Sequence, residues 1–215
     1  SKKKSSIKRY FFNDSLYKKI LKKKKNPLLN KKYQLLKKYR KMITFVYQNK
    51  PLGTGDAVLK CSKHINTKHF LMLLPDDLIT KKNCSKEMIS LYRKKKSSII
   101  ATKWVSKNEV SRYGILTVKN KQKNHFQISD VVEKPSANKA KSNFAIIGRY
   151  ILPSKIFSEI RKTNKGHGGE IHITDAIKSL IKKDEKFYGC IFKGKYLDCG
   201  TLRGYVNSSK SIGKK

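Results

Sequence analysis

Acidic residues are scarce in this chain of 215 residues. Its 14 Asp and Glu stand against 52 Lys and Arg, which gives a formal net charge of +38. A charge of this size suggests a polyanionic partner such as nucleic acid. Only seven of the basic residues are Arg, however, whereas proteins that read nucleic acids depend on the planar guanidinium. Lys, Ile, Asn, Tyr and Phe share A- and T-rich codons, so drift towards such codons would give the same charge. We favour this interpretation and expect the lysines to form a solvated surface, with no specific nucleic-acid partner.

Cysteine pairs and long apolar runs are also missing. The four cysteines contain no C-x-x-C pair, and the histidines at positions 167 and 172 lack the spacing of zinc ligands, so we expect no structural zinc. Free thiols are typical of a reducing compartment, which predicts a cytoplasmic protein. No segment approaches the roughly 18 apolar residues of a membrane span. The Lys-rich N-terminal segment lacks the apolar core of a secretory signal, so we expect no membrane partner.

The apolar pattern predicts one α/β domain over residues 1–215, with a helical hairpin inserted at 1–42. Helical spacing over 15–41 is interrupted at Asn26-Pro27. The predicted strands are 43–47, 70–74, 98–103, 113–118, 126–132, 144–151 and 187–193; the predicted helices begin at 56 and 201 or span 84–96, 154–162 and 174–183. Alternating strands and helices favour parallel pairing, whereas 113–132 is typical of a hairpin. We therefore expect a Rossmann-like, mixed but mainly parallel sheet flanked by helices.

The most informative stretch is the apolar run 70–74, which is followed by Pro75 and then by Asp76 and Asp77. Five apolar residues without polar alternation predict a strand that is covered on both faces. The two acids then fall at the C-terminal end of this strand, where open α/β sheets bind their ligands. We expect Asp76 to have a function there and Asp77 to be a loop residue within 75–83. The structural alternative for an acid at a strand end is a turn or a helix cap.

Two further strand ends carry charged residues, Glu133-Lys134 and Asp198. Two carboxylates from different strands can hold a divalent cation whose remaining positions go to water and phosphate oxygens. Lys134 could neutralise a phosphate, and Glu133 could accept hydrogen bonds from sugar hydroxyls. These residue types together indicate phosphate chemistry.

Gly53-Thr54-Gly55 precedes a predicted helix, where it allows a close backbone approach and points amides at an anion or a base edge. The motif is neither a Walker loop nor a complete G-x-G-x-x-G fingerprint. Thr174 is expected to be a structural N-cap, and Glu170 could be either structural or functional. We expect the single Trp, Trp104, to pack in the core rather than to stack on a base.

Seven motifs in a fixed order resemble those of bacterial UTP–glucose-1-phosphate uridylyltransferases, also called UDP-glucose pyrophosphorylases. They are Gln48-x-x-Pro51-Leu52-Gly53-Thr54-Gly55-x-Ala57-Val58, Leu73-Leu74-Pro75-Asp76-Asp77, Tyr113-Gly114-Ile115, Val132-Glu133-Lys134-Pro135, Ser142-Asn143-x-Ala145-Ile146-x-Gly148-Arg149-Tyr150, Gly168-Gly169-Glu170-Ile171-x-x-Thr174-Asp175-Ala176 and Asp198-Cys199-Gly200. The resemblance covers nearly the whole chain, including the hairpin. It implies a nucleotide-diphospho-sugar transferase fold and the synthesis of UDP-glucose and pyrophosphate from UTP and glucose 1-phosphate.

The resemblance also implies roles for individual residues. By position, Asp76 and Asp198 match the Mg²⁺ ligands of the family, and Gln48 and Gly53 match residues that contact the uracil. Gly114 and Glu133 would contact glucose, and Lys134 would bind the sugar phosphate. Lys134 and Asp76 would be the catalytic residues. Displacement at phosphorus between anions needs positioning and charge neutralisation rather than a protein nucleophile, which agrees with this set. Homo-oligomers are usual in the family.

One departure from the family pattern concerns the start of the chain. Family members begin with a strand and a basic, glycine-rich loop that wraps the nucleotide triphosphate, and we expect this chain to begin after that unit. A fragment of a longer product, a misassigned start and a decaying gene all fit, and the activity of the chain alone stays open. Two other hypotheses also remain: a related transferase for another nucleotide or sugar, and a non-catalytic, basic nucleic-acid-binding remnant.

Overall fold

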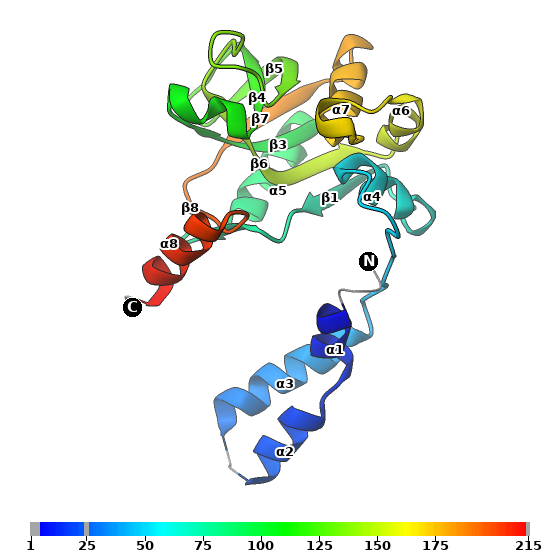
Figure 1. The fold of residues 1–215 in the computed structure, drawn as a ribbon, viewed down its shortest axis with the longest axis vertical. Helices are drawn as coiled ribbons and strands as arrows, with labels where there is room; N and C mark the ends of the chain where they lie inside the picture. The colour runs from blue at the N-terminus through cyan, green and yellow to red at the C-terminus, as the bar shows by residue number, and fades with distance from the viewer. Residues whose placement is uncertain (1–4, 24–25, 214–215) are drawn as a thin grey trace. The chain divides into compact units, whose positions relative to one another are not determined.

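The computed structural model describes residues 5–23 and 26–213. The chain divides into two compact units, Ser1–Pro51 and Leu52–Lys215, which are described separately below (Figure 1). None of the helices in the described ranges is long and apolar enough to span a lipid bilayer. All four cysteines are free thiols, as the sequence predicts.

The first unit contains the predicted helical hairpin. Its helices are α1 (Ser5–Phe12), α2 (Ser15–Lys23) and α3 (Pro27–Arg40). The side chain of Asn26 caps α3 by accepting a 2.9 Å hydrogen bond from the amide of Leu29. The carboxylate of Asp14 accepts a 2.8 Å hydrogen bond from the Tyr33 hydroxyl and pairs with Arg40 at 3.0 Å. These two contacts lower the pKa of Asp14 and fasten the beginning of α2 to α3.

The strand predicted at 43–47 is wrong, because residues 43–48 have no regular secondary structure. Their apolar, β-branched composition suits a strand, but a strand also needs a hydrogen-bonding partner. Neither sheet of the described chain includes this segment.

The second unit is built on a six-stranded sheet with the order β1-β6-β3-β7-β5-β4 and a two-stranded sheet β2-β8. The strands are β1 (His69–Leu73), β2 (Asp77–Thr80), β3 (Ser98–Trp104), β4 (Gly114–Lys119), β5 (His125–Glu133), β6 (Phe144–Pro153), β7 (Phe187–Ile191) and β8 (Lys195–Asp198). The mixed α/β class is confirmed, and strands β1, β3, β4 and β7 run in the same direction. Only β3 and β7 are parallel neighbours, because β6 and β5 run the opposite way between the others. Strands β2 and β8 were not predicted, since each has only four residues.

Helices cover both faces of the large sheet. They are α4 (Thr54–Lys60), α5 (Cys84–Lys95), α6 (Ile156–Lys162) and α7 (Ile173–Lys182). The last helix, α8 (Leu202–Gly213), packs against β8 instead, and the short 3₁₀ turns are η1 (Ser62–His64), η2 (Lys107–Arg112) and η3 (His167–Gly169). Ile100 faces α4, α6 and α7 in one buried cluster, whereas its neighbours Ile99 and Ala101 face α5 in another. This alternation explains why β3 reads as an uninterrupted apolar run. Every predicted helix of this unit is present to within two residues.

Strand β1 differs from its prediction, because only one of its faces is covered. Phe70 and Met72 pack against the larger core, but Leu71 and Leu73 are 40% and 50% exposed. β1 lies at an end of the sheet and pairs with β6 alone, while α5 packs over the centre of the sheet. An apolar run therefore identified the strand correctly but not its environment.

Gly189 provides a test of the packing between β5 and β7. A Cβ at this position would lie 2.5 Å from Cζ of Phe126, which is fully buried and is its register partner. We expect Gly189→Ala to lower the free energy of unfolding by about 1–3 kcal/mol, measured by urea denaturation, because the phenyl ring has no space to move. The control is Gly213→Ala, where an added Cβ would meet nothing within 4 Å. Equal stability of the two variants would contradict this account of the core.

Candidate active site

A pocket of about 580 Å³ lies where β1, β5 and β8 end and β4 begins. Five of the seven site residues that the sequence suggests line it: Asp76, Gly114, Glu133, Lys134 and Asp198. They come from four separate parts of the chain, and the sheet topology brings them together. Gly53 is the neighbour of the lining residue Thr54, and Gln48 belongs to the first compact unit.

Asp76 and Asp198 converge on Gly200. A Cβ at Gly200 would lie 3.1 Å from Oδ2 of Asp76 and 3.4 Å from Oδ1 of Asp198. The Gly200 amide donates to Oδ1 of Asp198 at 2.9 Å, and the Cys199 amide donates to the backbone carbonyl of Asp76 at 2.8 Å. The absence of a side chain at Gly200 therefore leaves space that both carboxylates flank, which suits a divalent cation.

No group of three or more His, Cys, Asp or Glu side chains within the described ranges could hold a metal ion. Two carboxylates still fit Mg²⁺, because this ion keeps several water ligands and usually binds one or two protein carboxylates together with substrate phosphates. The donor set is therefore compatible with magnesium but not with a closed site made of protein ligands alone.

Asp77 is not the loop residue that the sequence suggested. It begins β2, and its carboxylate accepts hydrogen bonds from the Gly148 amide at 2.7 Å and from the Tyr196 hydroxyl at 2.5 Å. Arg149 also donates to its backbone carbonyl. Burial raises the pKa of Asp77, and burial together with the hydrogen bond to Asp77 raises that of Tyr196. Asp77 thus connects the two-stranded sheet β2-β8, which we call the β2–β8 ribbon, to β6. The sequence could not predict this role, because the partners Gly148 and Tyr196 are distant in the chain.

The opposite side of the pocket holds Glu133. Its Oε2 accepts a 2.9 Å hydrogen bond from the hydroxyl of Thr174, and Gly114 is its register partner on β4. A Cβ at Gly114 would lie 3.2 Å from the same oxygen, so the glycine leaves room for the carboxylate. The prediction of Thr174 as an N-cap is wrong, because His172 is the N-cap residue of α7 and Thr174 instead orients Glu133. Lys134 follows with a left-handed φ of 43°, a conformation that is uncommon outside glycine and that often occurs at functional sites.

The glycine turn lies close to another backbone segment of the chain itself, and the prediction that its amides point at an anion or a base edge is wrong for Gly55. Gly53 has a φ of 104°, and a Cβ there would lie 2.5 Å from the carbonyl oxygen of Ile171. Ile171 donates to the carbonyl of Leu52 and accepts from the amide of Gly55, both at 2.8 Å. The Gly55 amide is therefore occupied by the chain rather than directed at an anion. This docking also brings Glu170 into the lining of the pocket.

Arg112 is a site residue that sequence reasoning missed. It lines the pocket, donates to Oδ2 of Asp198 at 2.6 Å and lies over the ring of Tyr113, with 5.5 Å between the guanidinium carbon and the ring centroid. The sequence did offer a signal for Arg112. Arginine is rare in this chain, with only seven residues, and Arg112 directly precedes the motif Tyr113-Gly114-Ile115.

The chain belongs to the Nucleotidyl transferase family, whose pattern it matches over residues 7–215. It is 38% identical over 175 residues to the UTP–glucose-1-phosphate uridylyltransferase of Pseudomonas aeruginosa, covering 77% of this chain and 61% of the relative. It is 34% identical over 173 residues to the Bacillus subtilis uridylyltransferase YngB, covering 80% and 58%. The chain thus spans about three fifths of the length of these relatives.

Solved structures show the same relationship. A UDP-glucose pyrophosphorylase complexed with UDP-glucose superposes with a TM-score of 0.76 at 37% identity, covering 80% of this chain and 66% of that chain. A UTP-bound enzyme from Acinetobacter baumannii gives a TM-score of 0.77 at 29% identity over 98% of this chain and 73% of its own. The resemblance that the motifs suggested is therefore confirmed, and with it the nucleotidyltransferase fold.

A comparison of Gly53 with Gly168 separates two reasons for a glycine, the positive φ that both residues have and the close backbone contact that only Gly53 makes. We expect Gly53→Ala to lower the free energy of unfolding by about 2–5 kcal/mol, because φ is unfavourable and the Cβ meets the Ile171 carbonyl. Gly168→Ala, with a φ of 67° and nothing within 4 Å of the added Cβ, should cost only about 1 kcal/mol. Urea denaturation measures both values. Equal losses would show that Gly53 is required by its φ alone and not by the docking of residue 171.

Proposed function

We propose that this chain forms the catalytic centre of a transferase that makes UDP-glucose and pyrophosphate from UTP and glucose 1-phosphate. The single observation that carries the proposal is the convergence of Asp76, Asp198, Glu133 and Lys134 in one pocket, at the positions that match the motifs of the family. The similarity of the chain to uridylyltransferases, at 34–38% identity, supports the choice of substrates.

The proposed reaction is an in-line displacement at phosphorus. A phosphate oxygen of glucose 1-phosphate attacks the α-phosphorus of UTP, the bond from that phosphorus to the oxygen bridging the α- and β-phosphates breaks, and pyrophosphate leaves with the bonding electrons. Both reactants are anions, so the protein must position them and reduce their repulsion. We assign the sugar phosphate to the ammonium group of Lys134 and a glucose hydroxyl to Glu133, whose carboxylate Thr174 already orients.

Asp76 and Asp198 are the residues that would hold Mg²⁺. The glycine at position 200 leaves the space between their carboxylates open, which is the structural support for this assignment. When bound there, Mg²⁺ neutralises phosphate charge as the charge shifts towards the leaving group. Arg112 contacts Oδ2 of Asp198 at 2.6 Å, so it competes with a cation for that oxygen.

Several assignments stay predictions. Gln48 and Gly53 are assigned to uracil by motif position, although the crowding at Gly53 gives that glycine a structural reason as well. Homo-oligomerisation and a cytoplasmic location also stay predictions. The relatives do not favour a transferase for another nucleotide or sugar, nor a basic nucleic-acid-binding remnant.

The two acids provide the test. In a version of the chain that is extended with the N-terminal strand and glycine-rich loop of the family, with UTP and glucose 1-phosphate, we expect pyrophosphate release that requires Mg²⁺. Asp76→Asn and Asp198→Asn should each lower kcat/KM about 100-fold or more, because each removes charge from the place where phosphate charge must be neutralised. Asp130→Asn is the matched control: Asp130 pairs with Lys178 at 3.4 Å and does not line the pocket. No turnover in this extended protein, or unchanged turnover in its Asp76→Asn variant, would contradict the proposal.

A further inference from the structure

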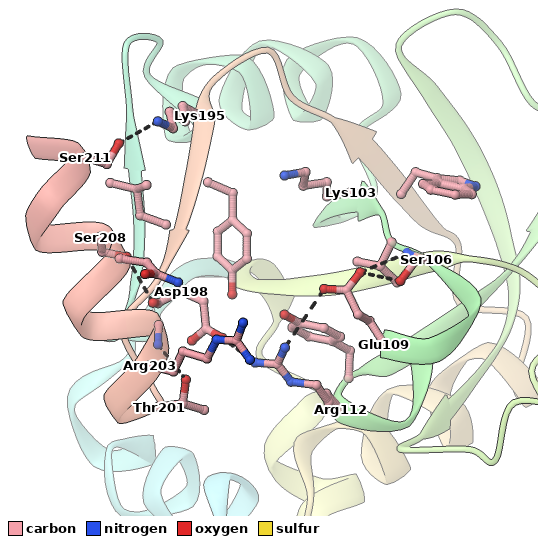
Figure 2. Close-up of a pocket in the computed structure, with 17 residues that line it drawn as sticks. Lys103, Ser106, Glu109, Arg112, Lys195, Asp198, Thr201, Arg203, Ser208 and Ser211 are labelled. Atoms are coloured by element: carbon pink, nitrogen blue, oxygen red, sulfur yellow. Dashed lines mark hydrogen bonds and ion pairs between the residues drawn. The ribbon is translucent and has the colours of Figure 1, made fainter.

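A second pocket, of about 900 Å³, adjoins the candidate active site. It lies between the end of β3, η2, β8 and α8 (Figure 2). Arg112, Tyr113, Tyr196, Asp198 and Thr201 line both pockets, so the two cavities share a wall. None of the roles proposed above for the transfer reaction uses the rest of this second cavity.

Two arginines enter this second pocket from opposite sides. Figure 2 shows Arg112 extending from η2 and Arg203 from α8. Lysines are so frequent in this chain that a lysine in a pocket indicates little, but the chain has only seven arginines. Two of these seven in one cavity form a recurrent arrangement for binding phosphate, because each planar guanidinium can donate two parallel hydrogen bonds.

The positive charge of the pocket exceeds its negative charge. Its lining contains the four cations Lys103, Arg112, Lys195 and Arg203 but only two acids, Glu109 and Asp198. Both acids are within ion-pair distance of Arg112, at 4.0 Å and 2.6 Å. Within the described part of the chain, no acid forms an ion pair with Arg203.

The lysines of the pocket have neutral partners. The ammonium group of Lys195 donates to the hydroxyl of Ser211 at 2.5 Å. That of Lys103 lies 5.6 Å from the centroid of the Tyr196 ring. Neither contact cancels a charge, so both ammonium groups remain able to attract an anion.

Trp104 also lines this pocket, and its prediction as a core residue is wrong. The residue is 61% exposed, because it stands at the end of β3 beyond the covered part of the sheet. Trp104 is the only tryptophan of the chain, so the pocket contains the only indole side chain.

We propose that this second pocket, the arginine pocket, binds a phosphate-bearing anion through Arg112 and Arg203. Its volume exceeds what a single phosphate fills and accommodates a pyrophosphate or a nucleotide. An anion that engages Arg112 takes it from Asp198, and this consequence rests on the proposed function because it frees a carboxylate assigned to Mg²⁺. The binding itself does not depend on catalysis.

The fluorescence of Trp104 gives a signal from this pocket, since Trp104 lines it and no other indole is present. Inorganic pyrophosphate is titrated into the whole chain at physiological salt, with a chelator to exclude metal ions. We expect a saturable change, and about tenfold weaker binding in Arg203→Gln because a charge-assisted contact is lost. The matched control Arg93→Gln removes the same charge from α5, outside both pockets. Equal weakening in the two variants would overturn the proposal, because it would show general attraction to a polycation.

A change of opposite sign gives a second test. Asp198→Asn should strengthen pyrophosphate binding severalfold, because it removes the acid that competes for Arg112. Asp130→Asn, the matched control, should not. Unchanged or weaker binding in Asp198→Asn would count against the pocket. Arg203→Lys keeps the charge and loses the planar fork, so its pyrophosphate affinity should lie between those of Arg203→Gln and the unaltered protein. It replaces Arg203→Gln in the test if that variant does not fold.

The source of the phosphate is separated by comparing pyrophosphate with UTP and with glucose 1-phosphate under the same metal-free conditions. Tighter binding of UTP assigns the arginine pocket to a nucleotide, and equal binding assigns it to the phosphate groups alone. Absence of an Arg203-dependent response to all three would overturn the proposal. Because no turnover is required, a protein without transferase activity can still bind, and an active transferase can fail this test.

Discussion

The hydrogen bonds of the Asp77 carboxylate hold the candidate site together. Its two oxygens accept from the Gly148 amide on β6 and from the Tyr196 hydroxyl on β8. β2 and β8 form only a short two-stranded sheet, and such a ribbon has little stability of its own. Asp76 precedes this anchor, and Asp198 is the register partner of Asp77 across the ribbon. A partly buried carboxylate that binds no substrate in our assignment therefore determines where the two functional carboxylates lie.

The few acidic residues of the chain are concentrated at the candidate active site. Five of the 14 acidic residues line one pocket: Asp76, Asp77, Glu133, Glu170 and Asp198. In a chain of net charge +38, such a gathering requires a reason beyond solubility. The proposed cation site would account for Asp76 and Asp198, and the hydrogen bonds to Gly148 and Tyr196 account for Asp77. The excess of lysine by itself indicates no partner, whereas two rare arginines that line one pocket support our proposal of a phosphate-bearing anion.

The sequence predicted best what depends on local pattern. The uninterrupted run of β3 and the helical spacing of α5 were located to within one residue, because residues close in the chain determine them. It predicted less well what depends on distant partners. Residues 43–47 have strand composition but no strand to pair with, and β1 has one uncovered face because helices pack elsewhere on the sheet.

The same distinction applies to the site. Motif order identified five residues that line one pocket, since each follows or begins a recognisable strand. The roles of Asp77, Arg112 and Thr174 depend on contacts across 71, 86 and 41 residues of sequence. Such contacts are set by topology and leave no local signal. Gly53 shows both effects, because its need for glycine was evident while its partner, Ile171, was not.

The most direct test of this account is the affinity of the protein for Mn²⁺, a spectroscopic substitute for Mg²⁺, with and without the Tyr196 hydroxyl. Tyr196→Phe alters neither proposed ligand but removes one of the two side-chain contacts of Asp77. We predict one Mn²⁺ site by electron paramagnetic resonance in the unaltered protein, and about tenfold weaker binding in Tyr196→Phe, as for other groups that orient metal ligands. Equal Mn²⁺ affinity in the two proteins, or no site in the unaltered one, would contradict it.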